Sequence, residues 1–92
     1  MVFMINLSDE SLLDIKGTRA YYSKVSQSIL KKFDAELTES IERLKLNPNH
    51  FQKRYRNINI VFTKRFPFGI HYIFEKETVY IQRILHQKRF YK

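Results

Sequence analysis

The sequence contains no cysteine and no long apolar run. Without cysteine the chain has no disulfide, no thiolate metal ligand and no cysteine nucleophile, so its stability must come from packing or association. No apolar run approaches the ~18 residues that a membrane-spanning helix needs. Residues 1–7 lack a basic start and run directly into Asp9 and Glu10, so they make a poor signal peptide. These absences predict a soluble, unprocessed chain, and a cytoplasmic location fits them.

Acidic residues are scarce in the second part of the chain. Residues 51–92 carry ten Lys and Arg against Glu75 and Glu77, whereas residues 1–50 carry seven residues of each sign. Residues 51–92 also contain ten of the fourteen aromatic residues. A basic, aromatic-rich region favours a large acidic partner, either nucleic acid or an acidic protein segment.

The length of 92 residues allows one hydrophobic core, because a fold of this size buries only about 60–65% of its unfolded surface. The hydrophobic share of 43% excludes the composition of a disordered chain. We therefore expect residues 1–92 to form a single domain.

Two helices are predicted in the first part. Ser8 is a typical N-cap, and acidic residues follow it, which indicates a helix over about residues 9–24. Ser26 precedes a second helix over residues 27–46, where apolar residues recur at three- and four-residue spacing. The apolar stripe of the first helix is partial: Leu12, Ile15, Tyr22 and Val25. The short connection predicts an antiparallel helical hairpin.

Strand patterns surround this hairpin. The near-continuous apolar run of residues 2–7 indicates a strand that is buried on both faces. Apolar residues alternate with others over residues 57–63, 68–74 and 79–85, which predicts three further strands. The expected fold is α+β, in the order β-α-α-β-β-β, with the helical hairpin packed on one face of a small antiparallel sheet.

Several short runs accompany this order of elements: Asp14-Ile15, Tyr21-Tyr22, Phe33, Arg65-Phe66-Pro67-Phe68-Gly69-Ile70-His71-Tyr72 and Ile84-Leu85-His86-Gln87-Lys88-Arg89. Together they resemble the RelE/ParE superfamily of bacterial toxins from type II toxin–antitoxin modules, and most closely its ParE, plasmid-stabilisation branch. The resemblance implies a growth-inhibiting toxin that a cognate antitoxin neutralises. That antitoxin is expected to be acidic and partly disordered, because such a segment can order on a basic surface.

The resemblance implies two possible targets. ParE-type members inhibit DNA gyrase, whereas RelE-type members cut mRNA on the ribosome. Gly69 stands where we expect the RelE-type nucleases to carry a phosphate-binding Arg. Ile60 and Phe62 stand near the positions where those nucleases carry lysines on their strands. This pattern favours inhibition of gyrase by a toxin that catalyses no reaction itself. The alternative is a metal-independent ribonuclease with His86, Tyr91 and Arg89 as catalytic residues, and a non-toxic nucleic-acid or protein-binding module is the third possibility.

Candidate binding residues lie towards the end of the chain. Aromatic residues beside cations in the final segment favour packing or binding over free exposure to water. The residues expected to bind the target or the antitoxin are Arg65, Arg83, Lys88, Arg89, Phe90 and Tyr91. A second cluster of Lys53, Arg54 and Arg56 either binds as well or protects a sheet edge from aggregation.

The remaining candidates have ordinary structural explanations. Histidines at positions such as His71 and His86 more often bond a neighbouring backbone group than perform chemistry. Neither has a carboxylate at ligand spacing, so we expect no metal site. We also expect no cofactor and no small-molecule substrate. Tyr21, Tyr22 and Phe33 are expected to pack in the core or within the helical hairpin.

Overall fold

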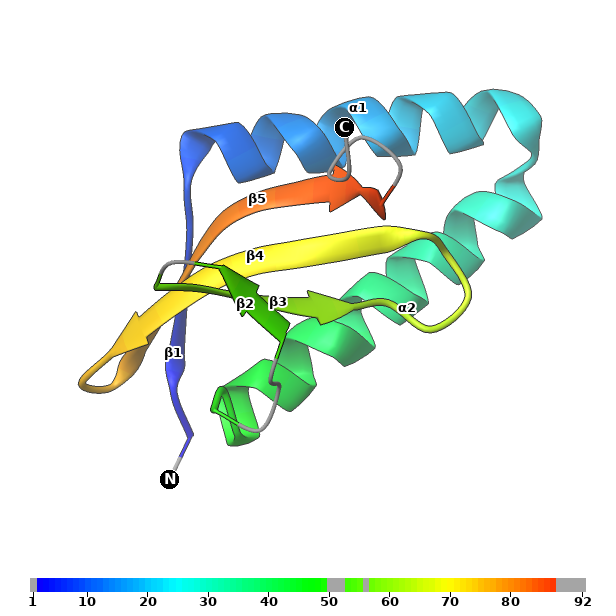
Figure 1. Cartoon of the computed structure of the whole chain (residues 1–92). Helices are drawn as coiled ribbons and strands as arrows, with labels where there is room; N and C mark the ends of the chain where they lie inside the picture. The colour runs from blue at the N-terminus through cyan, green and yellow to red at the C-terminus, as the bar shows by residue number, and fades with distance from the viewer. Residues whose placement is uncertain (1, 50–52, 56, 88–92) are drawn as a thin grey trace.

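A pair of antiparallel helices lies against one face of a five-stranded sheet (Figure 1). The computed structural model describes residues 2–49, 53–55 and 57–87. The elements are β1 (Met4–Leu7), α1 (Asp9–Val25), α2 (Gln27–Leu46), β2 (Lys53–Tyr55), β3 (Ile58–Phe62), β4 (Phe68–Glu75) and β5 (Thr78–His86). Helix α2 lies behind β3 and β4, while α1 runs beside β5 (Figure 1). The predicted fold class is confirmed.

Two serines set the limits of the helices, as the sequence indicates. The hydroxyl oxygen of Ser8 accepts a bond from the N–H of Ser11 at 3.0 Å, which caps α1. Ser26 ends α1 and caps α2, because its hydroxyl oxygen accepts from the N–H of Ile29 at 2.9 Å. The predicted helix boundaries therefore agree with the structure to within one residue. No helix in the described part of the chain is long and apolar enough to span a bilayer.

The sheet is mixed, which corrects the prediction of a purely antiparallel one. Its strand order is β1-β5-β4-β3-β2, and β2 to β5 pair antiparallel. Strand β1 pairs with β5 in parallel, with Met4 opposite Thr78. Parallel pairing of two strands needs a long connection between them, and the connection from β1 to β5 begins with the helical hairpin. The short edge strand β2, which contains Lys53 and Arg54, was not predicted.

Strand β1 also corrects the expectation of burial on both faces. Met4 is 68% exposed, whereas Ile5 and Leu7 pack against the core. A run of apolar residues indicates a strand but cannot say whether that strand lies at an edge. Here β1 occupies the edge beside β5, so one of its faces stays open to solvent.

The core lies between α2 and the sheet face that the helices cover. Phe33, Leu37 and Leu44 of α2 are buried there. The sheet contributes Val61, Phe68, Ile70, Tyr72, Val79, Ile81 and Ile84. Helix α1 adds Ile15 and Tyr22 to the same core.

Two expectations for α1 were wrong. Leu12 and Val25 belong to the predicted apolar stripe, but both are exposed. Tyr21 was expected to pack in the core or within the helical hairpin. It is 65% exposed and lies outside the core, although its ring contacts that of Tyr22, which packs inside. Helix α1 therefore keeps apolar side chains on its surface.

Candidate partner-binding site

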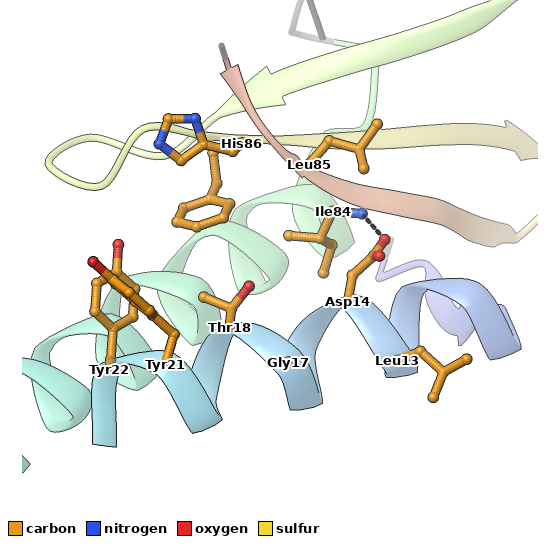
Figure 2. A pocket seen from close by; sticks show the side chains of 10 residues that line it. Leu13, Asp14, Gly17, Thr18, Tyr21, Tyr22, Ile84, Leu85 and His86 are labelled. Carbon is orange, nitrogen blue, oxygen red and sulfur yellow. Dashed lines mark hydrogen bonds between the residues drawn. The ribbon is translucent and has the colours of Figure 1, made fainter. Parts of the chain in front are cut away.

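A cavity of about 560 Å³ opens between α1 and the end of β5 (Figure 2). Its lining comes from successive turns of α1, from the first residue of β4 and from the last residues of β5: Leu13, Asp14, Gly17, Thr18, Tyr21, Tyr22, Phe68, Ile84, Leu85 and His86. Most of these side chains are apolar or aromatic. Such a lining suits the apolar groups of a bound molecule.

Asp14 holds the floor of this cavity together. Its carboxylate accepts two bonds from the guanidinium of Arg83, at 2.9 and 3.0 Å. The same carboxylate accepts a bond from the backbone N–H of Ile84 at 2.9 Å (Figure 2). This hydrogen bonding raises the pKa of Arg83. One acidic side chain of α1 therefore joins the helix to β5 through both a side chain and the backbone.

Ser8 bonds neighbouring backbone groups at the same edge of β5. Its backbone N–H donates to the carbonyl of Ile81 at 3.0 Å, and its hydroxyl donates to the carbonyl of Gln82 at 2.7 Å. Strand β1 ends one residue earlier, at Leu7. The carbonyls of Ile81 and Gln82 in β5 are thus bonded by the residue that caps α1.

Aromatic rings form the inner wall of the cavity. Tyr22 packs edge-on against Phe68, with ring centroids 6.4 Å apart, and it also contacts Phe33 and Phe66 at 5.3 and 5.2 Å. Burial raises the pKa of the Tyr22 hydroxyl. The imidazole of His86 packs edge-on against Phe68 at 5.4 Å. These contacts hold the wall rigid beneath the exposed ring of Tyr21.

The sheet face opposite the helices is apolar at its centre. Gly69 lies opposite Phe62, and a Cβ at Gly69 would come within 3.1 Å of the Ile60 side chain. His71 follows on the same face and is 1% exposed. Gly69, Ile60 and Phe62 are the positions that differ from the expected nuclease pattern. They are therefore packed together, and none of them is a Lys or Arg.

Burial lowers the pKa of His71 below its ordinary value of 6.5, and the positive charge of Arg83 acts in the same direction, while Asp14 opposes it. The unfolded chain therefore binds this proton more readily, and stability is lost as the pH falls from about 6.5 towards the folded pKa. We expect the His71 ring signals to titrate with a midpoint below 6.5 in an NMR titration. His71→Gln should reduce the loss of unfolding free energy between about pH 7 and 5. An ordinary midpoint would contradict this expectation.

The structure brings two of the predicted site residues together and separates a third. Arg83 and His86 both lie on β5. His86 lines the cavity, and so does Asp14, to which the guanidinium of Arg83 is bonded. Arg65 lies in the β3–β4 loop, where its backbone N–H donates to the Glu36 carboxylate at 2.6 Å. Glu36 also accepts from the N–H of Phe66 at 2.9 Å, which fixes the loop. The other four predicted binding residues lie outside the described residues: Lys88, Arg89, Phe90 and Tyr91.

Sequence reasoning missed the contribution of α1 to the site. Asp14 entered only as part of the family resemblance, Tyr21 entered there and as an expected packing residue, and Gly17 is visible in the sequence only as a weak point of a helix. Their spacing of three and four residues was the available signal, because such residues share a helix face. Among the described residues, no group of three or more His, Asp or Glu side chains is placed to hold a metal ion.

Comparisons with known proteins show the family of this chain and a solved structure with the same fold. The family model described as the ParE toxin of the type II toxin–antitoxin system parDE matches residues 5–91. Curated protein sequences gave no match. A solved structure titled as the chromosomal ParDE toxin–antitoxin system from P. aeruginosa shares the fold, with a TM-score of 0.79 at 13% identity over 92% of this chain and 96% of that chain. Since the family match spans nearly the whole sequence, this chain belongs to the ParE toxin family of type II toxin–antitoxin systems.

Proposed function

We propose that this chain acts as a toxin by inhibiting DNA gyrase, and that a cognate acidic antitoxin neutralises it. In this proposal the toxin makes and breaks no bonds itself. Gyrase and its DNA lie in the cytoplasm, where we expect the chain to act.

We choose gyrase over RNA as the target because the central strands have few cations. Cleavage of RNA without a metal needs cations around the crowded phosphate, a base for the 2′-hydroxyl and an acid for the leaving oxygen. Strands β3, β4 and β5 contain a single Lys or Arg, which is Arg83. Its guanidinium is bonded to Asp14, so part of its charge is already balanced. Such a sheet is better suited to protein binding than to phosphate chemistry.

The net charge of +8 supports an acidic antitoxin. Opposite charges speed the encounter of two chains and select against wrong partners. The exposed apolar residues of α1 would provide the contact area that charge alone cannot provide.

The test is a supercoiling and DNA-cleavage assay with purified gyrase. We expect excess toxin to inhibit supercoiling and to trap broken DNA, and addition of the antitoxin to reverse both effects. Intact supercoiling at toxin excess would remove the gyrase proposal. If translated mRNA were instead cut at fixed codon positions, the ribonuclease alternative would replace it, and His86→Ala should then reduce the cleavage rate by about a hundredfold or more, as for loss of a general acid or base.

A further inference from the structure

We infer that two copies of this chain pair through the exposed sides of their α1 helices, which lie antiparallel about a twofold axis at Gly17. The inference goes beyond the proposed function and does not depend on it, because it concerns the chain by itself. Three features of α1 support it: an exposed apolar stripe, a glycine at the centre of that stripe, and opposite charges at equal distances on either side.

The apolar stripe runs along the side of α1 that borders the cavity. Leu13, Gly17 and Tyr21 follow one another at four-residue spacing, so they lie in a row along the helix. Leu13 is 66% exposed and Tyr21 is 65% exposed. Figure 2 shows these two side chains on either side of Gly17. A second molecule that covered both would remove apolar surface from water.

Gly17 leaves a gap at the centre of the stripe. Among the described residues, no atom lies within 4 Å of a Cβ built at Gly17. Its backbone has no positive φ. A glycine within a helix lowers helix stability relative to alanine, so the fold alone would favour alanine here. The missing side chain is explained if a second helix approaches the backbone of α1 closely at this point.

The charged residues on the same side make this surface complementary to itself. Glu10 lies seven residues before Gly17 and Lys24 lies seven residues after it, and both side chains are exposed. Seven residues are nearly two helical turns, so both charges lie in line with Gly17, roughly 10 Å from it along the helix axis.

An antiparallel pair uses this symmetry. With the twofold axis at Gly17, Glu10 of each copy lies opposite Lys24 of the other. Leu13 of each copy lies opposite Tyr21 of the other, which covers both apolar side chains. A parallel pair would instead place like charges opposite each other at both ends. The sequence of α1 therefore selects the antiparallel arrangement.

The net charge of the chain leaves this surface available to a second copy, because the positive excess lies elsewhere. Residues 51–92 hold ten Lys and Arg against two Glu, whereas residues 1–50 hold seven residues of each sign. Helix α1 is itself balanced, with three acidic and three basic residues: Asp9, Glu10, Asp14, Lys16, Arg19 and Lys24. At physiological salt, exposed charges more than about 8 Å apart are largely screened from one another.

Sedimentation velocity of the purified chain tests the association. One helix side per copy makes a small interface, so we expect a dissociation constant on the order of 10 μM. Monomer should give way to dimer as the concentration rises through this value. A chain that is still monomeric at about ten times this concentration overturns the inference.

Reversal of single charges tests the antiparallel arrangement. Lys24→Glu places two carboxylates opposite each other at both ends of the pair, and Glu10→Lys does the same with two ammonium groups. Each variant alone should raise the dissociation constant about tenfold or more. An equal mixture of the two variants should associate as wild type does, because each Lys again lies opposite a Glu. A mixture that stays monomeric overturns the inference.

Two controls accompany this experiment. Recovery in the mixture shows that both variants are folded. Lys31→Glu reverses an exposed charge on α2, and it should change the constant less than about twofold.

Gly17→Leu tests the point of closest approach. Leucine is a better helix former than glycine, so the variant should unfold at the same or a higher temperature than wild type. Its side chain should hold the two helices apart and raise the dissociation constant about tenfold or more. Thr38→Leu places a leucine at an exposed position of α2, and it should change the constant less than about twofold.

A dimer that forms equally well in wild type, Gly17→Leu and Lys24→Glu uses another surface and overturns the inference. Such a result would not touch gyrase inhibition, which the supercoiling assay tests separately.

Discussion

Phe33→Ala should lower the free energy of unfolding by about 3–5 kcal/mol, the usual cost of removing a buried ring. Phe33 is 1% exposed, and its ring lies 5.3 Å from Tyr22 and 5.6 Å from both Phe66 and Phe68. The substitution removes the ring that these three contact and leaves a cavity in the core. Domains of this size are stable by about 5–15 kcal/mol, so the loss is a large part of the total.

Urea unfolding monitored by circular dichroism would measure this effect. Phe33→Leu should recover part of the loss, because leucine fills more of the space than alanine. Tyr21→Ala is a matched control on the helical hairpin, since it removes an aromatic ring that is mostly exposed. We expect this control to change stability by less than about 1 kcal/mol. Equal losses in Phe33→Ala and Tyr21→Ala would contradict the packing described here.

Local patterns in the sequence were sufficient to predict the helices. Ser8 and Ser26 act within one turn of their own positions, so their capping role can be predicted from neighbouring residues alone. Alternation likewise indicated β3, β4 and β5. Each of these features depends on contacts between residues that are close in the sequence.

Contacts between distant residues escaped prediction. Parallel pairing of β1 with β5 joins residues more than seventy positions apart, as Met4 and Thr78 illustrate. Tyr21 and Tyr22 are neighbours in the sequence with the same side chain, yet one is exposed and the other is packed in the core. The weak apolar periodicity of α1 left open which side of that helix would meet β5.

The cavity illustrates the same limit at the level of function. Gly17 and Asp14 become informative only when α1 is known to lie beside the last strand. In the sequence, Gly17 is a weak point in a helix and Asp14 is one carboxylate among several. The basic residues drew attention to the end of the chain, whereas the described structure adds a largely apolar site on α1.

Asp14→Ala should lower the free energy of unfolding by about 1–3 kcal/mol, mainly because it leaves the N–H of Ile84 without its acceptor in a partly buried position. The ion pair with Arg83 contributes less, since the Arg83 side chain is 46% exposed and surface pairs are worth roughly 0–1 kcal/mol. The loss should also loosen α1 from the end of β5. Hydrogen exchange at Ile84 should therefore accelerate more than exchange in β4.

Two further variants separate the backbone contact from the ion pair. Arg83→Leu removes the pair and keeps the bond from the Ile84 N–H to Asp14, so it should cost less than about 1 kcal/mol. Asp14→Asn keeps an oxygen that can accept from Ile84, and its loss should fall between those of the other two variants. If Arg83→Leu were as destabilising as Asp14→Ala, the ion pair would be the main link between α1 and β5. The order Asp14→Ala, then Asp14→Asn, then Arg83→Leu would identify the backbone of β5 as the group that Asp14 stabilises, and with it the floor of the cavity.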